Sequence, residues 1–436
     1  MGPYIGAAMT RGSISGDIVP RVSYVGEVPS WTRGGGARYA LPMKRPLLAV
    51  VAILFVTTAY LLAWPIPVQP VVWSAPVAPG YAGPHVVNTR LSALTHLPLG
   101  GDVGPEHVVV REEQGEPWIW MAVAAADQRA GRIVRMRPDG RDREVVFAST
   151  GRPLGFDFDS AGALIVADPM FGAHGGLLRV TGRGADASTE LLTDRVGDTP
   201  LRYVDAVVVA TDGRIYLSDA SQRFGAREFG GTFEASVLDI IEHQCSGRIL
   251  QYDPATRATV VVLRDLCFPN GVALSHDQQT LFVAETGAYR IWRVRVDARE
   301  LSAAHAAHTP DPRAAIVLDN LPGYPDNLMR GTNGRIWTGL TKPRSGFIDT
   351  NASRPWLRAL AMRLPTFLWP VPPAYGHVFA FTEDGYVVED LQDPSGAYPE
   401  TTAVTEFGDR WFIQSLHATT LGVITRTQAA HSLLYM

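Results

Sequence analysis

One unit recurs between residues 100 and 436, and it constrains the fold more than any other feature of the chain. It consists of a polar residue, an apolar run, a turn and a second apolar run. The clearest copies are DAVVVATDGRIYLSD from Asp205, NGVALSHDQQTLFVAE from Asn270 and DNLMRGTNGRIWTGL from Asp326. In all three, a turn residue follows the first residue by seven positions. Short apolar runs separated by turn residues at regular spacing predict repeated strand hairpins.

Three looser copies bring the number of units to six. They are EHVVVREEQGEPWIW from Glu106, LGFDFDSAGALIVAD from Leu154 and TTAVTEFGDRWFIQS from Thr401. Most copies are followed by a second hairpin, such as GRILQYDPATRATVVVL at 247–263. Two hairpins give four strands, which is one blade of a β-propeller. The sequence therefore predicts an all-β fold, a six-bladed β-propeller over residues 100–436.

The N-terminal region predicts a transmembrane helix. Residues 47–64, LLAVVAILFVTTAYLLAW, contain no charge and are long enough to be a membrane-span candidate. Basic residues precede this run at Arg33, Arg38, Lys44 and Arg45, and the next one after it is Arg90. The positive-inside rule then places the N-terminus in the cytoplasm and the propeller on the extracytoplasmic side. A cleaved signal peptide is the alternative, but the apolar run is longer than usual and the best cleavage site, near Ser74-Ala75, is poor.

These patterns predict four segments. Residues 1–42 are Gly-rich and aperiodic, and we expect them to be disordered or to precede the true start at Met43. Residues 43–66 form the transmembrane signal anchor. Residues 67–99 form a linker and the first propeller strand region, with many Pro and Val in their first part.

Charge and cysteine content limit the possible partners. The formal net charge is −4 and no long basic run occurs, which argues against nucleic acid as a partner. The two cysteines, Cys245 and Cys267, fit neither a zinc spacing nor a disulfide scaffold. They flank the hairpin at 247–263, so they can form a disulfide outside the cytoplasm; a pair of buried thiols is the alternative.

The first residues of the six units are candidate metal ligands. In a propeller the inner strand of each blade comes first, so these residues meet at one end of the central channel. Four of them, Glu106, Asp205, Asn270 and Asp326, carry the oxygen donors that Ca²⁺ prefers. Three converging carboxylates would repel one another without a cation, and the absence of His and Cys from these positions favours calcium over zinc. The alternative is that Asp and Asn merely cap turns at strand starts.

The repeated strings resemble a known family. YVDAVVVATDGRIYLSDAS, GRILQYDP, FPNGVALS, AETGAYRIWR, LPGYPDNLMR and LQDPSG resemble the strictosidine synthase-like proteins, from about residue 100 to the C-terminus. Gluconolactonase and paraoxonase propellers are more distant relatives of that family. The resemblance implies calcium at the channel mouth, held by Glu, Asn and Asp. By position, Glu106 corresponds to the first-blade Glu, Asn270 to the Asn of the N-G-V motif and Asp326 to the Asp of the P-D-N motif, whereas Asp205 stands where the family usually has Asn.

The resemblance and the predicted ligands together indicate a calcium-dependent hydrolase of esters or lactones that acts on a small molecule. Calcium would polarise the carbonyl, and a carboxylate or histidine beside it would activate water. The candidate catalytic residues are Asp326 and His417, since His417 follows the second strand of the last blade on the metal face. His107 and His243 are weaker candidates. For each histidine the alternative is a structural or surface role.

Two other functions stay open from the sequence. One is a binding or scaffold propeller whose calcium is structural. The other is a condensing enzyme like strictosidine synthase, which uses a Glu in its last blade. The sequence aligns Thr401 or Thr402 with that Glu, with Glu400 and Glu406 nearby, so synthase activity is not favoured.

Two long insertions join second to third strands and are therefore expected on the metal face. They are residues 220–246 and residues 341–376. The second contains WLRALAMRLPTFLW, which is apolar with interspersed arginines. It could form a lid, dock on a membrane surface or pack as a helix on the propeller rim.

Overall fold

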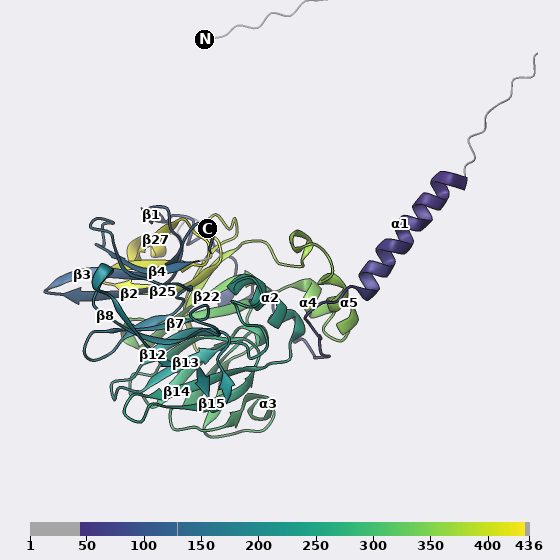
Figure 1. Ribbon diagram of the computed structural model, residues 1–436. Coiled ribbons are helices and arrows are strands. Elements are labelled where there is room, and N and C mark those ends of the chain that lie inside the picture. Colours follow the sequence, from purple (N-terminus) through teal and green to yellow (C-terminus); the bar gives the residue numbers. More distant parts are fainter. Residues whose placement is uncertain (1–43, 129, 432–436) are drawn as a thin grey trace, which may run out of the picture. The chain divides into compact units, whose positions relative to one another are not determined.

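The computed structural model describes residues 44–128 and 130–431, and six sheets arranged as propeller blades, each built on four antiparallel strands, account for most of them (Figure 1). This confirms the predicted six-bladed propeller. The first three blades are β2 (Val103–Glu113), β3 (Glu116–Ala124), β4 (Gly131–Met136) and β5 (Glu144–Ala148); β6 (Phe156–Phe158), β7 (Leu164–Asp168), β8 (Gly176–Thr181) and β9 (Ser188–Thr193); and β12 (Val204–Val209), β13 (Ile215–Asp219), β14 (Gly247–Asp253) and β15 (Ala258–Leu266). The predicted segment 1–42 and the start at Met43 lie outside the described residues.

The remaining blades follow the same order. They are β16 (Pro269–Leu274), β17 (Thr280–Glu285), β18 (Arg290–Arg295) and β20 (Ala314–Leu318); β21 (Gly323–Arg330), β22 (Arg335–Pro343), β23 (Gly376–Thr382) and β24 (Val387–Asp393); and β25 (Thr401–Phe407), β26 (Arg410–Ser415), β27 (Thr420–Thr425) and β1 (Thr95–Pro98). Short additional elements are β10 (Arg195–Val196), β11 (Thr199–Pro200), β19 (Leu301–Ser302), η2 (Gly184–Asp186), η3 (Thr286–Ala288), η4 (Thr332–Gly334), α3 (Ala303–Ala306) and α6 (Arg426–His431).

The last blade closes the ring because it combines both ends of the propeller. β1 comes from before the first blade, and it pairs antiparallel with β27 from the last. The outer strand of the sixth blade, β1, therefore lies more than three hundred residues before its partner β27 in the sequence. Closure of this kind removes the need for the first and last blades to find each other through side chains alone.

The core lies between the blades and within each sheet. The inner strands are buried along most of their length because both of their faces pack against neighbouring blades. Fully buried tryptophans contribute at matching positions, and the rings of Trp337 and Trp411, from the fifth and sixth blades, meet edge to face at 5.0 Å. The apolar runs of the repeated unit thus supply the contacts that hold adjacent blades together.

The chain before the propeller contains a long helix, α1 (Lys44–Ala63). Its sequence is rich in Leu, Val and Ala, and residues Arg45–Ala63 have a mean hydropathy of 2.3. The helix is therefore long and apolar enough to cross a membrane.

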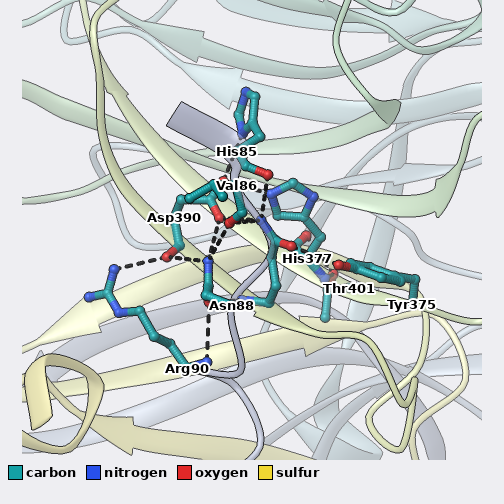
Figure 2. Close-up of polar contacts among 9 residues, drawn as sticks. His85, Val86, Asn88, Arg90, Tyr375, His377, Asp390 and Thr401 are labelled. Carbon is teal, nitrogen blue, oxygen red and sulfur yellow. Dashed lines mark hydrogen bonds and ion pairs between the residues drawn. The ribbon is translucent and has the colours of Figure 1, made fainter. Parts of the chain in front are cut away.

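A buried carboxylate fastens the chain before β1 to the fifth blade (Figure 2). His85, in η1 (Gly83–His85), and His377, at the start of β23, each place a ring nitrogen 2.7 Å from Asp390 Oδ2. Asn88 and Gln392 donate to Asp390 Oδ1 at 2.9 and 2.6 Å. Burial opposes ionisation of Asp390, but the hydrogen bonds from His377 and His85 outweigh it and hold its pKa below the usual range. This network orients the segment that leads into the closing strand β1.

Both predicted insertions carry helices, which Figure 1 shows gathered on one side of the sheets. The first holds α2 (Thr232–Glu242), and the second holds α4 (Gly346–Thr350), α5 (Pro355–Ala361) and η5 (Thr366–Leu368). Leu238 and Ile241 of α2 belong to the same buried apolar cluster as Ile348 and Met362 of the second insertion. The cluster also includes Val68, so the segment after α1 packs beneath the helices.

Cys245 and Cys267 form the disulfide that the sequence left open. The bond joins the residues just before β14 and just before β16. It therefore braces the chain that leads to Asn270. His243 lies beside it, with its ring stacked on Trp73 at a centroid distance of 3.8 Å.

We expect Asp390→Asn to lower the free energy of unfolding at pH 7 by about 2–4 kcal/mol, because the histidine donors lose an ionised acceptor. The depressed pKa of Asp390 stabilises the fold above the ordinary aspartate pKa of about 3.9, and this stabilisation is lost as the pH falls. The difference between wild type and variant should therefore shrink below about pH 4, as measured by urea unfolding in detergent. Asp384→Asn, on the exposed turn between β23 and β24, is the matched control. An equal effect of both substitutions, or a pH-independent difference, would contradict this role.

Candidate functional site

Five of the six inner strands begin with a break in their pairing. Across this break the inner strand contains more residues than its partner strand. The excess is one residue in β12, β16, β21 and β25, and two residues in β2. Four of the breaks span the predicted ligands, at Val103–His107, Val204–Val207, Pro269–Val272 and Pro325–Leu328, and the fifth lies at Thr401–Val404. A bulge interrupts the alternation of side chains and re-aims one of them, which is why such irregularities are common beside active sites.

Buried acids at the ends of the second strands hold the starts of the inner strands in place. Asp219 Oδ1, at the end of β13, accepts the backbone N–H groups of Arg202 and Tyr203 at 3.1 and 2.9 Å. Asp168 does the same for Arg152, and Glu285 for Cys267. Each acid is the last residue of one copy of the repeated unit, so its position recurs in the sequence.

The four predicted metal ligands line one cavity at the mouth of the channel. Glu106, Asp205, Asn270 and Asp326 all border it, and all four are buried. The cavity is open to solvent, and its empty space, counted out into that opening, is about 960 Å³. Apolar side chains of both insertions form its walls: Phe233, Val237, Ile240 and Ile241 of the first, and Ile348, Pro370, Val371 and Pro372 of the second. The site thus combines an acidic floor, formed by Glu106, Asp205 and Asp326, with apolar walls.

The acidic floor carries more negative charge than its surroundings neutralise. Burial raises the pKa of Glu106, and burial together with the neighbouring carboxylates raises those of Asp205 and Asp326 well above the ordinary value. Asn270 Nδ2 donates to Asp205 at 3.2 Å and to Asp326 at 3.4 Å. Arg152 offsets part of this charge, and its Nη2 lies 3.6 Å from Glu106 Oε2.

These residues fit a hard divalent cation. Asn270 Oδ1 is buried and has no hydrogen-bond partner among the described residues, so an oxygen ligand is available beside the carboxylates. Within the described chain, the carboxylate oxygens of Glu106, Asp205 and Asp326 do not all lie within 4.8 Å of one another. Carboxylate and amide oxygens are the donor type that Ca²⁺ prefers, and the ion binds such oxygens at about 2.3–2.6 Å.

A second polar group in the same cavity contains His417. Its Nδ1 bonds Glu400 Oε2, while Lys342 Nζ lies 2.5 Å from Glu400 Oε1. Burial, followed by the positive charges of Arg152 and Lys342, lowers the pKa of His417 to about 4. The imidazole is therefore neutral at pH 7 and available as a proton acceptor.

Glu400 lines the cavity in a role that the sequence pattern did not predict. It directly precedes the first residue of the last unit, and its φ of 51° is a left-handed conformation that non-glycine residues seldom adopt. Glu406, the other nearby acid, instead bonds Arg335, Arg426 and Trp337 away from the cavity. Thr402, one of the two threonines aligned with the family's last-blade Glu, donates to the carbonyl of Glu106 at 2.7 Å. The signal for Glu400 was its adjacency to the unit start, but only the backbone conformation determines where it points.

The two weaker histidine candidates do not line the cavity in the described structure. His107 is buried, and its ring meets Phe156 at 5.1 Å. Burial lowers its pKa to about 4. His243 packs on Trp73, as described above. Both have structural surroundings.

The chain matches two family models and several curated proteins. The strictosidine synthase model matches residues 205–298, and the model for the strictosidine synthase-like N-terminal region matches residues 83–136. Human adipocyte plasma membrane-associated protein is 30% identical over 355 residues, which cover 77% of this chain and 78% of the human protein. The chain belongs to the strictosidine synthase-like family. This confirms the resemblance that the repeated strings indicated.

Other relatives of this strictosidine synthase-like chain agree on the fold. Protein strictosidine synthase-like 10 of Arabidopsis thaliana is 31% identical over 307 residues, covering 68% of this chain and 74% of the plant protein. A solved structure described as a candidate gluconolactonase superposes with a TM-score of 0.50 at 16% identity, covering 77% of this chain and 93% of that one. At this identity the superposition shows the shared propeller and nothing about the reaction.

We expect Gly271→Ala to lower the melting temperature and to weaken cation binding at the floor. A Cβ at Gly271 would lie 2.3 Å from the backbone nitrogen of Leu328 and 2.5 Å from the carbonyl oxygen of Asp326, so the fifth blade must shift. Overpacking of this kind costs about 1–3 kcal/mol. Gly346→Ala is the control, because no atom lies within 4 Å of its added Cβ. Equal melting temperatures for the two variants would contradict the close approach of the inner strands.

Proposed function

We propose that this protein is a calcium-dependent hydrolase of small esters or lactones, anchored to a membrane by α1 with the propeller on the extracytoplasmic side. The observation that carries the proposal is the meeting, in one cavity, of three buried carboxylates, an unpaired amide oxygen and a neutral histidine. A cation would offset the repulsion among the carboxylates, and the neutral histidine would accept a proton.

Glu106, Asp205, Asn270 and Asp326 would hold Ca²⁺ through oxygen atoms. When bound, the ion would polarise the carbonyl of an ester or lactone and stabilise the negative charge that develops on its oxygen. The charge of Asp326, the predicted catalytic carboxylate, contributes through this ligand role. The amide nitrogen of Asn270 donates hydrogen bonds to Asp205 and Asp326. Its Oδ1, which has no hydrogen-bond partner among the described residues, would be the atom that binds the metal.

His417 would act as the general base. Its Nε2 takes a proton from water as the water oxygen bonds to the carbonyl carbon, and it returns that proton to the leaving alkoxide when the ester bond breaks. Glu400 orients the imidazole through Nδ1 and stabilises the charge that the ring acquires. Lys342 offsets the charge of Glu400, and the apolar walls from both insertions would contact the acyl or alcohol part of the substrate.

A second candidate is a condensation of the strictosidine synthase type. It is favoured by Glu400, a last-blade glutamate that lines the cavity. Turnover of tryptamine with an aldehyde that is lost in Glu400→Gln, without hydrolysis of any ester or lactone, would select this function.

Calcium binding is the first prediction from the proposed site. By isothermal titration, Asp326→Asn should weaken Ca²⁺ binding by at least about tenfold, since ligand charge sets affinity in oxygen-donor sites. A chelator should abolish hydrolysis of phenyl acetate and of a lactone panel, and excess Ca²⁺ should restore it. Calcium that raises the melting temperature without turnover on any substrate would indicate a scaffold protein, and unchanged affinity in Asp326→Asn would contradict the ligand set.

The general base gives a separate prediction. His417→Gln should reduce kcat/KM by about 10²–10⁴-fold while leaving Ca²⁺ affinity within about twofold, because the imidazole handles the proton and does not bind the ion. His276→Gln, at an exposed position on a hairpin turn, should change neither quantity. Retention of full activity by His417→Gln would rule out this histidine as the base.

A further inference from the structure

The insertion between β22 and β23 exposes large apolar side chains. Trp356 of α5 is 64% exposed, and Phe367 and Leu368 of η5 are 82% and 52% exposed. Single exposed apolar residues are ordinary on soluble proteins, but this insertion exposes three large ones between residues 356 and 368. We call Trp356, Phe367 and Leu368 the apolar face of the insertion.

This insertion contacts the chain just after the candidate span. Arg363 Nε donates to the carbonyl of Trp64 at 2.8 Å, and Trp64 directly follows the last residue of α1. A groove lies between the two segments. It is lined by residues between Ala63 and Pro70 and by Pro355, Trp356, Ala359 and Arg363 of the insertion. The insertion is therefore held beside the residues at which the chain would leave the bilayer. The exposed indole of Trp64 is itself typical of a membrane–water interface.

The charge of the insertion complements a lipid headgroup surface. Residues 344–376 contain four arginines and one aspartate, and that aspartate, Asp349, pairs with Arg344. Arg358 is buried and bonds backbone carbonyls, among them that of Ile241. In the described part of the chain, neither Arg354 nor Arg363 forms an ion pair with a carboxylate. These two arginines add positive charge around the apolar face, and anionic lipid headgroups attract positive charge.

We propose that the apolar face of the insertion is a second membrane contact, which inserts into the interfacial region of the bilayer that α1 spans. Trp356, Phe367 and Leu368 would enter the boundary between headgroups and acyl chains, while Arg354 and Arg363 bind phosphate groups. The partner is a lipid surface because the adjoining chain continues directly into an apolar helix of membrane-spanning length.

The same contact bears on the cavity. Met362, in the same insertion, packs in one buried cluster with Ile348 and Ile241, and both of these line the cavity wall. Docking of the insertion would therefore fix one wall of the candidate site near the bilayer. This part of the inference concerns position and does not depend on which reaction the site performs.

The test uses the full chain reconstituted into vesicles of phosphatidylcholine and phosphatidylglycerol that contain doxyl-labelled lipid. A fluorophore is attached at Thr366→Cys, beside the apolar face, or at Tyr386→Cys, on the exposed turn between β23 and β24. The native cysteines are joined in the disulfide, so labelling without reductant reaches only the introduced thiol. We expect quenching by doxyl lipid to be at least about twofold greater at position 366 than at position 386.

Phe367→Ser with Leu368→Ser, introduced into the Thr366→Cys chain, should reduce this quenching to the level of the control position. Omission of phosphatidylglycerol should reduce it partly, through loss of the arginine contacts. The anchor α1 keeps every variant in the vesicles, so the signal reports docking and not recruitment. The proposal is overturned if positions 366 and 386 are quenched equally, or if the double serine variant, with an unchanged melting temperature, is quenched as strongly as its parent.

Discussion

Mutual repulsion among buried carboxylates is the constraint around which the channel mouth is organised. The side chains of Glu106, Asp205 and Asp326 are all buried, and Arg152, 3.6 Å from Glu106, offsets part of their mutual repulsion. Isolated charges in such surroundings cost several kcal/mol each unless they are paired or bind a metal. A fold that keeps three acids there must either protonate them or bind a cation. The raised pKa values express that requirement, and bound calcium would satisfy it.

The propeller makes this concentration of charge possible because the closed ring fixes all inner strands at once. The strand β1 completes the sixth blade, and the Asp390 network holds the preceding segment in position. Bulges at the starts of five inner strands and buried acids at the ends of the second strands then set the direction of each side chain. Packing within and between the blades stabilises the fold. The two helical insertions supply the cavity walls, and the second also supplies the proposed membrane contact.

The sequence predicts the architecture and the positions of the candidate ligands because both follow from local periodicity. A unit that repeats six times places equivalent residues at one end of a ring, whatever the details of each blade. Arg152, Glu400 and Lys342 could not be predicted in the same way. Each reaches the cavity through long-range packing: Lys342 and Glu400 pair across two blades, and the orientation of Glu400 depends on a backbone conformation that its residue type disfavours. The role of His85 was equally hidden, since its partners lie about three hundred residues away.

A crystal structure of the protein grown with Ca²⁺ tests the central claim most directly. The account predicts one ion at the channel mouth, bound by oxygen atoms of Glu106, Asp205, Asn270 and Asp326 at about 2.3–2.6 Å. It is contradicted if the four side chains bind no ion at saturating calcium and instead pair only with Arg152 and one another.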